Sequence, residues 1–576
     1  MKWDLSRLYR GFDDENFARD IQAVESGYAS LLRDTVALSD AKGLSDILRG
    51  AQQAMSLLYK TFSYTQLTLA ADAGDERARM LIEKLSALTI GHQKLMSALS
   101  AYLADKDLAQ YAEADALLKE HAYLLTLLKR DAAHVLDPAI EDTVLRMQLT
   151  GGVAFNQLRD QLDAQHLIEL GGEKHPLSKI RGMAYSADAD VRRRAYEAEI
   201  AAYPAIESPM AACLNAIKGE TLTILPLRNY ESALDASLDS ARMDRKTLDA
   251  LIGAMQESLP AFRRFLRAKA RNLGYAGGLK FYDLFAPLGA SAREYTLDEA
   301  REMLRDVFTD FSPKMAAFID KTFDENLVDA YPRAGKVGGA FCASVHPLGV
   351  SYILSNFDGS LSSVSTLAHE LGHAYHSDCI MHLSVLLSDY PMPLAETASI
   401  FSETLLVNRL LADADADTRM TLLDQQLTDA AQVIVDILSR YLFETEVFDR
   451  RKDHVLTPKE LCAIMTDAQE QTYGDGLDAS CMHPYMWACK SHYYMVDYHF
   501  YNFPYAFGLL FGMGVYAQYL EKGAAFLPMY DALLASTSTG DVRDVAAGVG
   551  IDVTDIDFWR GSIRVLTERI DEFERL

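Results

Sequence analysis

Proline, glycine and long apolar runs are all scarce in this sequence. The 576 residues include only 16 prolines and 33 glycines, a composition that favours long helices over many short strands. No segment approaches the roughly 20 uninterrupted apolar residues that a membrane-spanning helix needs. The first residues, "MKWDLSRLYRGFDDE", lack the charged and then apolar pattern of a secretory signal. We therefore expect a mainly α-helical protein located in the cytoplasm, with no membrane association.

Paired cysteines are missing as well. The six cysteines lack the C-x-x-C spacing of metal and redox motifs and are scattered at Cys213, Cys342, Cys379, Cys462, Cys481 and Cys489. This pattern predicts neither a disulfide framework nor a thiolate metal site. We expect reduced thiols that pack as small hydrophobic side chains.

Basic residues are fewer than acidic residues over the whole chain. Lysine and arginine number 56 against 82 aspartates and glutamates, which gives a formal net charge of -26 at pH 7. Such a surface repels phosphate backbones and anionic lipid headgroups, and no concentrated basic stripe offsets it. We therefore expect no nucleic-acid partner, and the sequence indicates no obligate protein partner.

Helical periodicity dominates the first 330 residues. Apolar residues recur at steps of three and four between Arg245 and Gly274, with Gly274 as the predicted stop. Pro260 is predicted to kink or restart that helix. Asp137 and Pro138 are predicted as the N-cap and first residue of another helix. No repeat at a fixed period is present.

The pattern changes near Tyr331, where glycines become frequent. Residues 350–355 alternate between two faces as in a short strand, and Asp358-Gly359 is typical of a turn. This is the one convincing β region, and it leads directly into a histidine-rich segment. We expect the strand either to offer a free edge to the main chain of an extended peptide or to be a plain sheet strand.

The histidine-rich segment "STLAHELGHAYHSD" contains the motif H-E-x-x-H. On a helix His369 and His373 lie on one face, so both rings can bind one ion at Zn–N distances of about 2.0 to 2.1 Å. Glu370 lies about 100° further round, placed to hold a metal-bound water. His376 stands roughly 10 Å along the axis from His369, so we expect it to pack or to support the site from outside.

A third ligand is needed, because catalytic zinc sites commonly use two histidines and one carboxylate. The segment "PLAETASIFSETLLVNRLL" supplies Glu396 and Glu403, which lie on one helical face two turns apart. Only one can be the ligand, and the other is expected to orient a ligand histidine from outside the metal. Spacing alone leaves this choice open, although the apolar flanks argue against two ordinary surface glutamates.

Tyrosines are concentrated between Tyr485 and Tyr519, a stretch that holds eight of the chain's 29. Most of these rings are expected to pack, since a lone tyrosine is more often a core residue than a catalyst. Peptide hydrolysis on zinc nevertheless needs neutral donors directed at the developing oxyanion, and phenol or imidazole N–H groups suit that task. Spacing alone does not choose among them.

Several motifs together resemble one family. The stretches "AHELGHAYH", "AETASIFSE" and "HYYMVDYHFYNFPYAFG", preceded by "GKVGGAFC", are similar to zinc metallopeptidases of the thimet oligopeptidase and oligoendopeptidase F type, with the F branch closer. The stretches "WDLSRLY" and "YDLFAPLG" extend the resemblance nearly from end to end. It implies a large bundle-like helical body split by a deep substrate channel, with a small β-sheet next to the zinc helix. It also implies an N-terminal helical domain over residues 1–190 that forms part of the channel wall. A catalytic domain would follow over residues 191–576, with its core at about 335–510.

The resemblance also implies roles for individual residues. One zinc ion per chain would be bound by His369, His373 and Glu396, with Glu396 rather than Glu403 as third ligand. Glu370 would be the general base that acts through a metal-activated water to cleave internal bonds of short unstructured peptides. The remaining implied roles are transition-state stabilisation by His492 and Tyr505, and substrate contacts from Tyr498, Tyr501, Gly338 and Gly339.

Two other functions stay open at this point. A zinc exopeptidase on a similar scaffold would need a cation for the peptide terminus, and Arg333, Lys336 and Lys490 are the candidates. A catalytically silent peptide-binding protein would keep the channel without the chemistry, although the intact set of ligand and base residues argues against it.

Overall fold

The computed structural model describes residues 1–289 and 293–576, and it is mainly helical, as predicted. Two compact units divide the chain. Unit 1 comprises Met1–Val135, Arg293–Arg409 and Gln518–Gly550, and unit 2 comprises Leu136–Ala292, Leu410–Ala517 and Ile551–Leu576. The predicted domain boundary at residue 190 and the predicted substrate channel both stay predictions.

The N-terminal part of unit 1 is a group of helices around a leucine-rich core. Aspartates begin most of these helices: Asp14, Asp40 and Asp75, for example, each accept a backbone N–H of the first turn. Val24 and Leu31 pack against Leu44 and its neighbours within this core. The helices are α1 (Glu15–Val36), α2 (Ala41–Ala71), α3 (Glu76–Leu103), α4 (Leu108–Ala114), α5 (Ala116–Glu120) and α6 (Ala122–Asp131).

A three-stranded sheet lies in the middle of unit 1. Its strands are β3 (Val328–Asp329), β4 (Phe341–Val345) and β5 (Val350–Leu354), in the order β3-β5-β4. The predicted strand is confirmed as β5, but β5 is the central strand and all five of its residues are buried. The edge strands are β3 and β4, each of which pairs with β5 on one side only.

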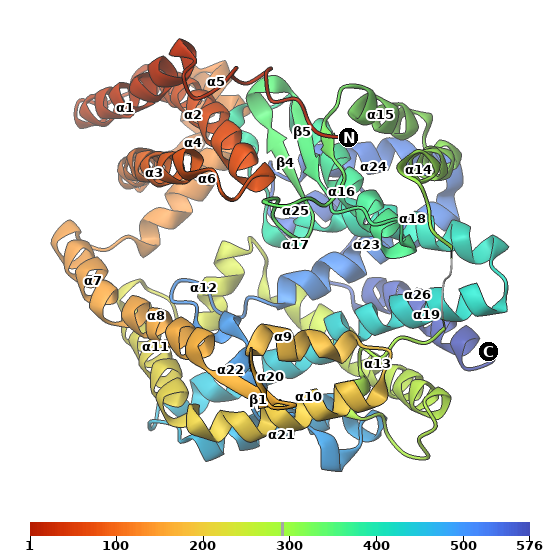
Figure 1. Ribbon diagram of the computed structural model, residues 1–576. Coiled ribbons are helices and arrows are strands. Elements are labelled where there is room, and N and C mark those ends of the chain that lie inside the picture. The colour runs from red at the N-terminus through yellow and green to blue at the C-terminus, as the bar shows by residue number, and fades with distance from the viewer. Residues whose placement is uncertain (290–292) are drawn as a thin grey trace. The chain divides into compact units, whose positions relative to one another are not determined.

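The other helices of unit 1 include α16, which packs against this sheet. Helix α16 contacts both β4 and β5, and Figure 1 shows it beside them. The predicted turn before it is present, with Gly359 in the left-handed region at φ 86°. These helices are α14 (Leu297–Phe311), α15 (Pro313–Asp324), α16 (Leu361–Ile380), α17 (Met392–Ala395), α18 (Thr397–Asp413, in unit 1 to Arg409), α24 (Leu527–Ser536) and α25 (Val542–Gly548).

Unit 2 is also helical, with one short hairpin. The hairpin joins β1 (Leu167–Leu170) to β2 (Glu173–Pro176) through Gly171 and Gly172, both at positive φ. A Gly-Gly pair is typical of a two-residue hairpin turn, but no strand was predicted there. The helices are α7 (Pro138–Thr150), α8 (Gly152–Gln165), α9 (Leu177–Gly182), α10 (Ala189–Ala202), α11 (Glu207–Leu227), α12 (Ala233–Ser240), α13 (Arg245–Asn272), α19 (Ala416–Ala431), α20 (Ile437–Arg451), α21 (Pro458–Tyr473), α22 (Met486–Cys489), α23 (Phe503–Lys522, in unit 2 to Ala517) and α26 (Ile556–Phe573).

Two predicted helix ends are confirmed in unit 2. Asp137 accepts the N–H of Ala139 and Pro138 is the first residue of α7. Helix α13 ends at Asn272, and Gly274 follows in the left-handed region at φ 87°. Of the two outcomes predicted at Pro260, the restart is wrong, because α13 continues through the proline without interruption, and the kink stays a prediction. Among the described helices, none combines the length and hydropathy needed to cross a membrane.

A buried charge cluster occurs in the core of unit 2. Arg181 Nη1 donates to Glu199 Oε1 at 2.7 Å and the Tyr203 hydroxyl donates to the same oxygen at 2.9 Å. His483 Nε2 lies 3.1 Å from it. Burial by itself raises the pKa of Glu199, but His483, Arg181 and Tyr203 outweigh it and hold the pKa at about 2. Glu199 therefore stays ionised in the folded protein well into the acid range.

Glu199→Gln is expected to destabilise the protein in a pH-dependent way. The folded pKa of about 2 lies below the ordinary value of 4.5, so the stabilisation is complete above pH 4.5 and is lost as the pH falls toward 2. This shift corresponds to about 3 kcal/mol of unfolding free energy. Denaturant unfolding at several pH values should show a difference between wild type and variant that shrinks below pH 4.5. Glu197→Gln, an exposed change on the same helix, is the control; a Glu199 difference that is constant down to pH 2.5 would contradict the prediction.

Candidate metal site and tyrosine cluster

Helix α16 carries the H-E-x-x-H motif next to the sheet. Ser360 begins the helix by accepting the N–H of Ser363. Val364, Leu367 and Leu371 are buried, and they fix which face of the helix is turned to the core. His369 and His373 follow each other by one turn on a half-buried face, and their rings meet edge to face with centroids 4.7 Å apart.

Three ligand atoms converge at this face. His369 Nε2 and His373 Nε2 are 3.1 Å apart, and Glu396 Oε2 lies 3.3 Å from the first and 3.4 Å from the second. Ligands bound tetrahedrally at about 2.0 to 2.2 Å lie about 3.3 to 3.6 Å from one another. The three atoms therefore have nearly the spacing of one face of a tetrahedral zinc site, and two imidazoles with one carboxylate are a donor set that zinc accepts.

Glu403 supports this group from the other side of His369. Its Oε1 lies 2.8 Å from His369 Nδ1, so Glu403 accepts the Nδ1–H and leaves the lone pair of Nε2 directed at the candidate site. Burial by itself lowers the pKa of His369, but the hydrogen bond and charge of Glu403, together with Glu396 and Glu370, raise it to about 9. The surroundings of His369 thus favour a positive charge at this point.

Glu396 remains ionised at neutral pH. Burial raises its pKa, but the hydrogen bond and charge of His373, the charge of His369 and a hydrogen bond from Ser399 lower it to about 2. The Ser399 hydroxyl donates to Glu396 Oε2 at 2.8 Å. Glu396 itself is the residue between α17 and α18, with φ -85° and ψ 1°. The carboxylate is therefore held by the junction of two helices rather than by the interior of one.

Gly372 allows the two glutamates to reach the histidines. A Cβ on Gly372 would lie 2.6 Å from the backbone oxygen of Ala398 and 2.7 Å from Ser399 Cα. Real Cβ atoms essentially never come that close to backbone, so α16 and α18 approach each other here only because residue 372 has no side chain. Sequence reasoning did not single out Gly372 or Ser399, although the glycine stands inside the motif.

Glu370 lies beside the histidines, and its side chain is buried. It is 6% exposed, and burial raises its pKa while the charges of His369 and His373 lower it in part. A carboxyl group with a raised pKa can accept and return a proton more readily than an exposed one. This is the environment that a general base needs.

Glu403→Gln is expected to lower metal affinity about 10- to 100-fold, because the charge that orients His369 and raises its basicity is lost while the shape is kept. Titration of zinc against a competing chelator measures the change. Glu302→Gln, an exposed change on α14 of the same unit, should bind zinc like the wild type. Equal affinities for Glu403→Gln and Glu302→Gln would contradict a supporting role for Glu403.

His376 has the packing position that was one of its two expected roles. It is fully buried, its Nε2 lies 2.8 Å from the hydroxyl of Thr537, and its ring stacks on Tyr390 with centroids 4.4 Å apart. Burial and then the charge of His373 lower its pKa to about 3. His376 is therefore neutral at physiological pH and belongs to the packing behind the histidine face.

The four predicted residues from the tyrosine-rich segment form one cluster in unit 2. The His492 ring stacks on Tyr501 with centroids 4.8 Å apart, and the hydroxyls of Tyr501 and Tyr505 are 2.9 Å apart. Tyr498 meets Tyr501 edge to face at 5.6 Å. Burial, followed by the charges of Arg440 and Lys490, lowers the pKa of His492 to about 4. A neutral imidazole at physiological pH can donate one N–H without carrying charge.

Buried charges hold the loop between His492 and Tyr505. Phe500, a non-glycine residue in the left-handed region at φ 52°, donates its N–H to Glu444 Oε2 at 3.0 Å. Lys218 donates to the other oxygen of Glu444 at 2.6 Å, and its Nζ lies 3.2 Å from His499 Nδ1. Strained backbone of this kind persists only where the surroundings fix it, so the loop has one defined conformation in unit 2.

Two other predicted groups of residues lie in unit 1. Gly338 and Gly339 are exposed just before β4, and Asn356 donates to the Gly339 carbonyl at 2.7 Å. Arg333 and Lys336 both pair with the buried carboxylate of Asp329, Arg333 through two bonds of 2.6 and 2.7 Å. Both cations are therefore held in ion pairs with Asp329.

Known proteins resemble this chain over its whole length. A sequence model described as Peptidase family M3 matches residues 182–565. Oligopeptidase PepF of Bacillus subtilis is 24% identical over 100% of this chain and 87% of its own, and group B oligopeptidase PepB of Streptococcus agalactiae is 24% identical over 100% and 97%. A crystal structure of a presumed peptidase from Chlamydophila abortus superposes with a TM-score of 0.87 at 21% identity, over 100% of this chain and 98% of that one.

Proposed function

The chain belongs to peptidase family M3 and is a metallopeptidase, and from this premise we propose that it is a zinc-dependent oligoendopeptidase that hydrolyses internal bonds of short, unstructured peptides. Relatives named oligopeptidase and oligoendopeptidase F support the substrate class. The observation that carries the proposal is the triangle of His369, His373 and Glu396 ligand atoms, 3.1 to 3.4 Å on each side.

Under this proposal His369, His373 and Glu396 hold one zinc ion, and Glu370 transfers protons. A zinc ion, when bound, supplies Lewis-acid charge that lowers the pKa of water toward 7 and polarises a carbonyl group. The Glu370 carboxylate takes the proton of the water that attacks the scissile carbonyl, and the resulting carboxyl group gives it to the leaving amine. Its burial supports both steps, because a raised pKa brings the acid and base forms closer in free energy.

We also propose that His492 and Tyr505 donate hydrogen bonds to the oxyanion that develops on the scissile carbonyl, with Tyr498, Tyr501, Gly338 and Gly339 in contact with the peptide. The low pKa of His492 supports this role, since a neutral ring is a donor whose charge does not change with modest shifts in pH. The hydroxyl pair of Tyr501 and Tyr505 supports it further, because one phenol can orient the other.

Tyr505→Phe is expected to lower kcat about 100- to 1,000-fold with little change in KM, because one donor to the transition state is lost and the ring remains. Steady-state kinetics on a fluorogenic peptide measures both constants. Tyr485→Phe removes a hydroxyl of unit 2 whose partner is Glu207, and should leave kcat near the wild-type value. A Tyr505→Phe enzyme within threefold of wild type would show that this hydroxyl has no part in the chemistry.

An exopeptidase remains the second candidate, and one observation favours keeping it. Lys490 is the one cation of the three considered that forms no salt bridge with another described residue, and it lines a cavity of about 470 Å³ in unit 2. Such an ammonium could bind the carboxylate at a peptide terminus. Arg333 and Lys336 are committed to Asp329, so Lys490 alone supports this function.

Internally quenched peptides blocked at both ends separate these functions. The proposed endopeptidase cleaves them, and a chelator stops the reaction until zinc is added back. An exopeptidase ignores blocked peptides but trims the unblocked ones, and Lys490→Gln then weakens it. A silent binding protein binds the peptides and cleaves neither set, which would overturn the proposal.

A further inference from the structure

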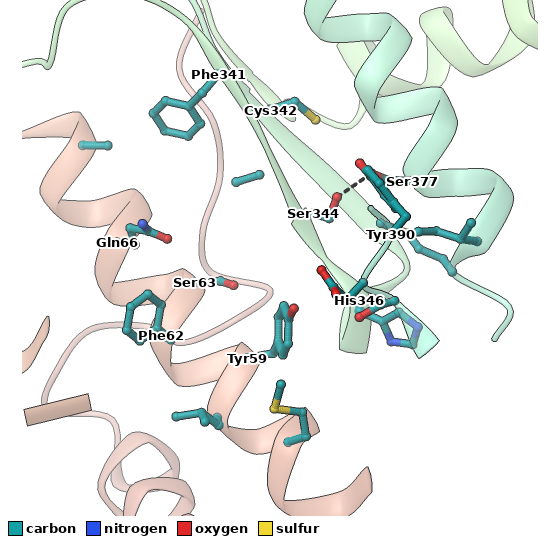
Figure 2. A pocket seen from close by; sticks show the side chains of 18 of the residues that line it. Tyr59, Phe62, Ser63, Gln66, Phe341, Cys342, Ser344, His346, Ser377 and Tyr390 are labelled. Atoms are coloured by element: carbon teal, nitrogen blue, oxygen red, sulfur yellow. Dashed lines mark hydrogen bonds between the residues drawn. The ribbon is translucent and has the colours of Figure 1, made fainter. Parts of the chain in front are cut away.

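A large cavity lies inside unit 1, along the edge of the sheet. Its volume is about 880 Å³, within the usual range of ligand pockets. One wall is a stripe of α2 with Met55, Tyr59, Phe62 and Gln66 at steps of three and four residues. Figure 2 shows Tyr59, Phe62, Ser63 and Gln66 on this helix and Phe341, Cys342 and Ser344 on the strand across from it. We call this cavity the α2–β4 pocket.

The β4 edge that borders the pocket has unpaired main-chain groups. Ile353 and Ser355 donate their N–H groups to Leu327 and Asp329 on the β3 side, so the even-numbered residues of β5 face β4. The register pairs those even residues with 341, 343 and 345. The N–H and C=O of Cys342 and Ser344 therefore point away from the sheet, and no hydrogen bond within residues 1–289 and 293–576 uses them.

The pocket surface is apolar and nearly free of charge. Tyr59 and Phe62 are only half-buried, so aromatic surface is left open to a ligand. Among the described residues that line the pocket, Asp389 is the one carboxylate, and none is lysine or arginine. Such a surface favours a bulky uncharged side chain and offers no cation to an acidic one.

Helix α16 relates the pocket to the candidate metal site. Ser377 and Ile380 line the pocket and follow His373 by four and seven residues, so they lie about 6 and 10 Å further along the same helical face. An extended peptide advances about 3.3 Å per residue, so this distance corresponds to two or three residues. The pocket is thus within reach of a peptide whose cleaved bond is at the histidines.

The direction of the peptide follows from β4. Burial, followed by the charge of Glu370, raises the pKa of the Cys342 thiol, whereas the Ser344 hydroxyl is hydrogen-bonded to that of Ser377 (Figure 2). Cys342 is therefore the residue nearer to the histidines, and β4 runs away from them as α16 does. Antiparallel pairing, the more stable arrangement, makes the added peptide run toward them. Its residues in the pocket then precede the cleaved bond.

We propose that the α2–β4 pocket is a specificity pocket for a bulky apolar or aromatic side chain of the substrate, two or three residues N-terminal to the cleaved bond. Cys342 and Ser344 hold the main chain of that segment. This inference rests on the proposed peptidase function.

Gln66→Lys tests the pocket by adding a positive charge to its α2 wall. Blocked, internally quenched peptides with Gly, Phe, Glu or Lys at one position at a time are compared by kcat/KM after the cleaved bond is located by mass spectrometry. The wild type should prefer Phe over Gly about 10-fold or more, at one position only, two or three residues before the cleaved bond. Gln66→Lys should raise the rate for Glu at that position up to about fivefold and leave other positions unchanged.

Gln53→Lys is the matched control, because Gln53 is an exposed residue on the opposite side of α2 and lines no part of the pocket. Its profile should equal that of the wild type. A profile of Gln66→Lys identical to that of Gln53→Lys would overturn the proposal, and so would a preference located after the cleaved bond.

A binding measurement separates this inference from the proposed function. The Glu370→Gln variant, with and without Gln66→Lys, is titrated with fluorescent peptides that carry Phe, Gly or Glu at each position. N-methylation of the peptide should weaken binding at alternate residues, because every second N–H pairs with β4. If the wild type cleaves no peptide, the proposed function fails. The specificity pocket is then supported if the Phe peptide binds more tightly than the Gly peptide and Gln66→Lys tightens binding of the Glu peptide. It is contradicted if either difference is missing.

Discussion

Glu370→Gln is expected to keep one zinc ion per chain and to hydrolyse peptides about 100- to 10,000-fold more slowly than the wild type. The amide has the shape of the carboxylate but can neither accept the proton of water nor return it to the leaving amine. The change should not lower stability, because burial already disfavours the ionised form of this side chain.

Three readouts check this prediction together. Metal analysis should give the wild-type stoichiometry, thermal unfolding should give an unchanged or higher Tm, and kcat should fall while KM stays within a few-fold. Glu302→Gln, the exposed change on α14, should match the wild type in all three. Near-normal turnover of a metal-loaded Glu370→Gln enzyme would show that another group moves the proton.

Glu396→Ala is expected to lower the affinity for zinc more than Glu403→Gln does. The binding free energy of a structural zinc site is on the order of 10 kcal/mol or more. Loss of one of three protein ligands removes about a third of it, which lowers the affinity roughly 100- to 1,000-fold. Activity should fall to background at trace zinc and recover in part with excess zinc. Competition with a chelator of known affinity measures the loss.

The comparison with Glu403 makes this prediction discriminating. Glu396→Ala should cost more affinity than Glu403→Ala, because Glu396 supplies a ligand atom and Glu403 only orients His369. The reverse order would exchange the roles of the two glutamates.

Much of the histidine helix could be predicted from residue order alone. Periodicity of four fixes that His369 and His373 share a face, and the structure places their Nε2 atoms 3.1 Å apart. The choice between Glu396 and Glu403 could not be made from spacing, because both lie near His369 on opposite sides of its ring. That choice depends on the break between α17 and α18 and on the approach that Gly372 permits, which are tertiary features.

The fold shows the same limit. Caps such as Asp137 and Gly274 are local, so the helix ends they mark were predictable. The restart predicted at Pro260 does not occur, because packing of a long helix on both sides of a proline can outweigh one lost hydrogen bond. The position of β5 in the centre of its sheet depends on β3 and β4 from elsewhere in the chain, so its alternation could not show that both faces are buried.

Anomalous X-ray diffraction at the zinc absorption edge, on crystals of the wild-type protein grown with zinc, tests the proposed metal site most directly. The result predicted is one dominant peak, bonded to His369 Nε2, His373 Nε2 and Glu396 Oε2 at about 2.0 to 2.2 Å, with Glu403 on His369 Nδ1. A zinc-replete crystal with no peak there, or with Glu396 turned away from both rings, would contradict it.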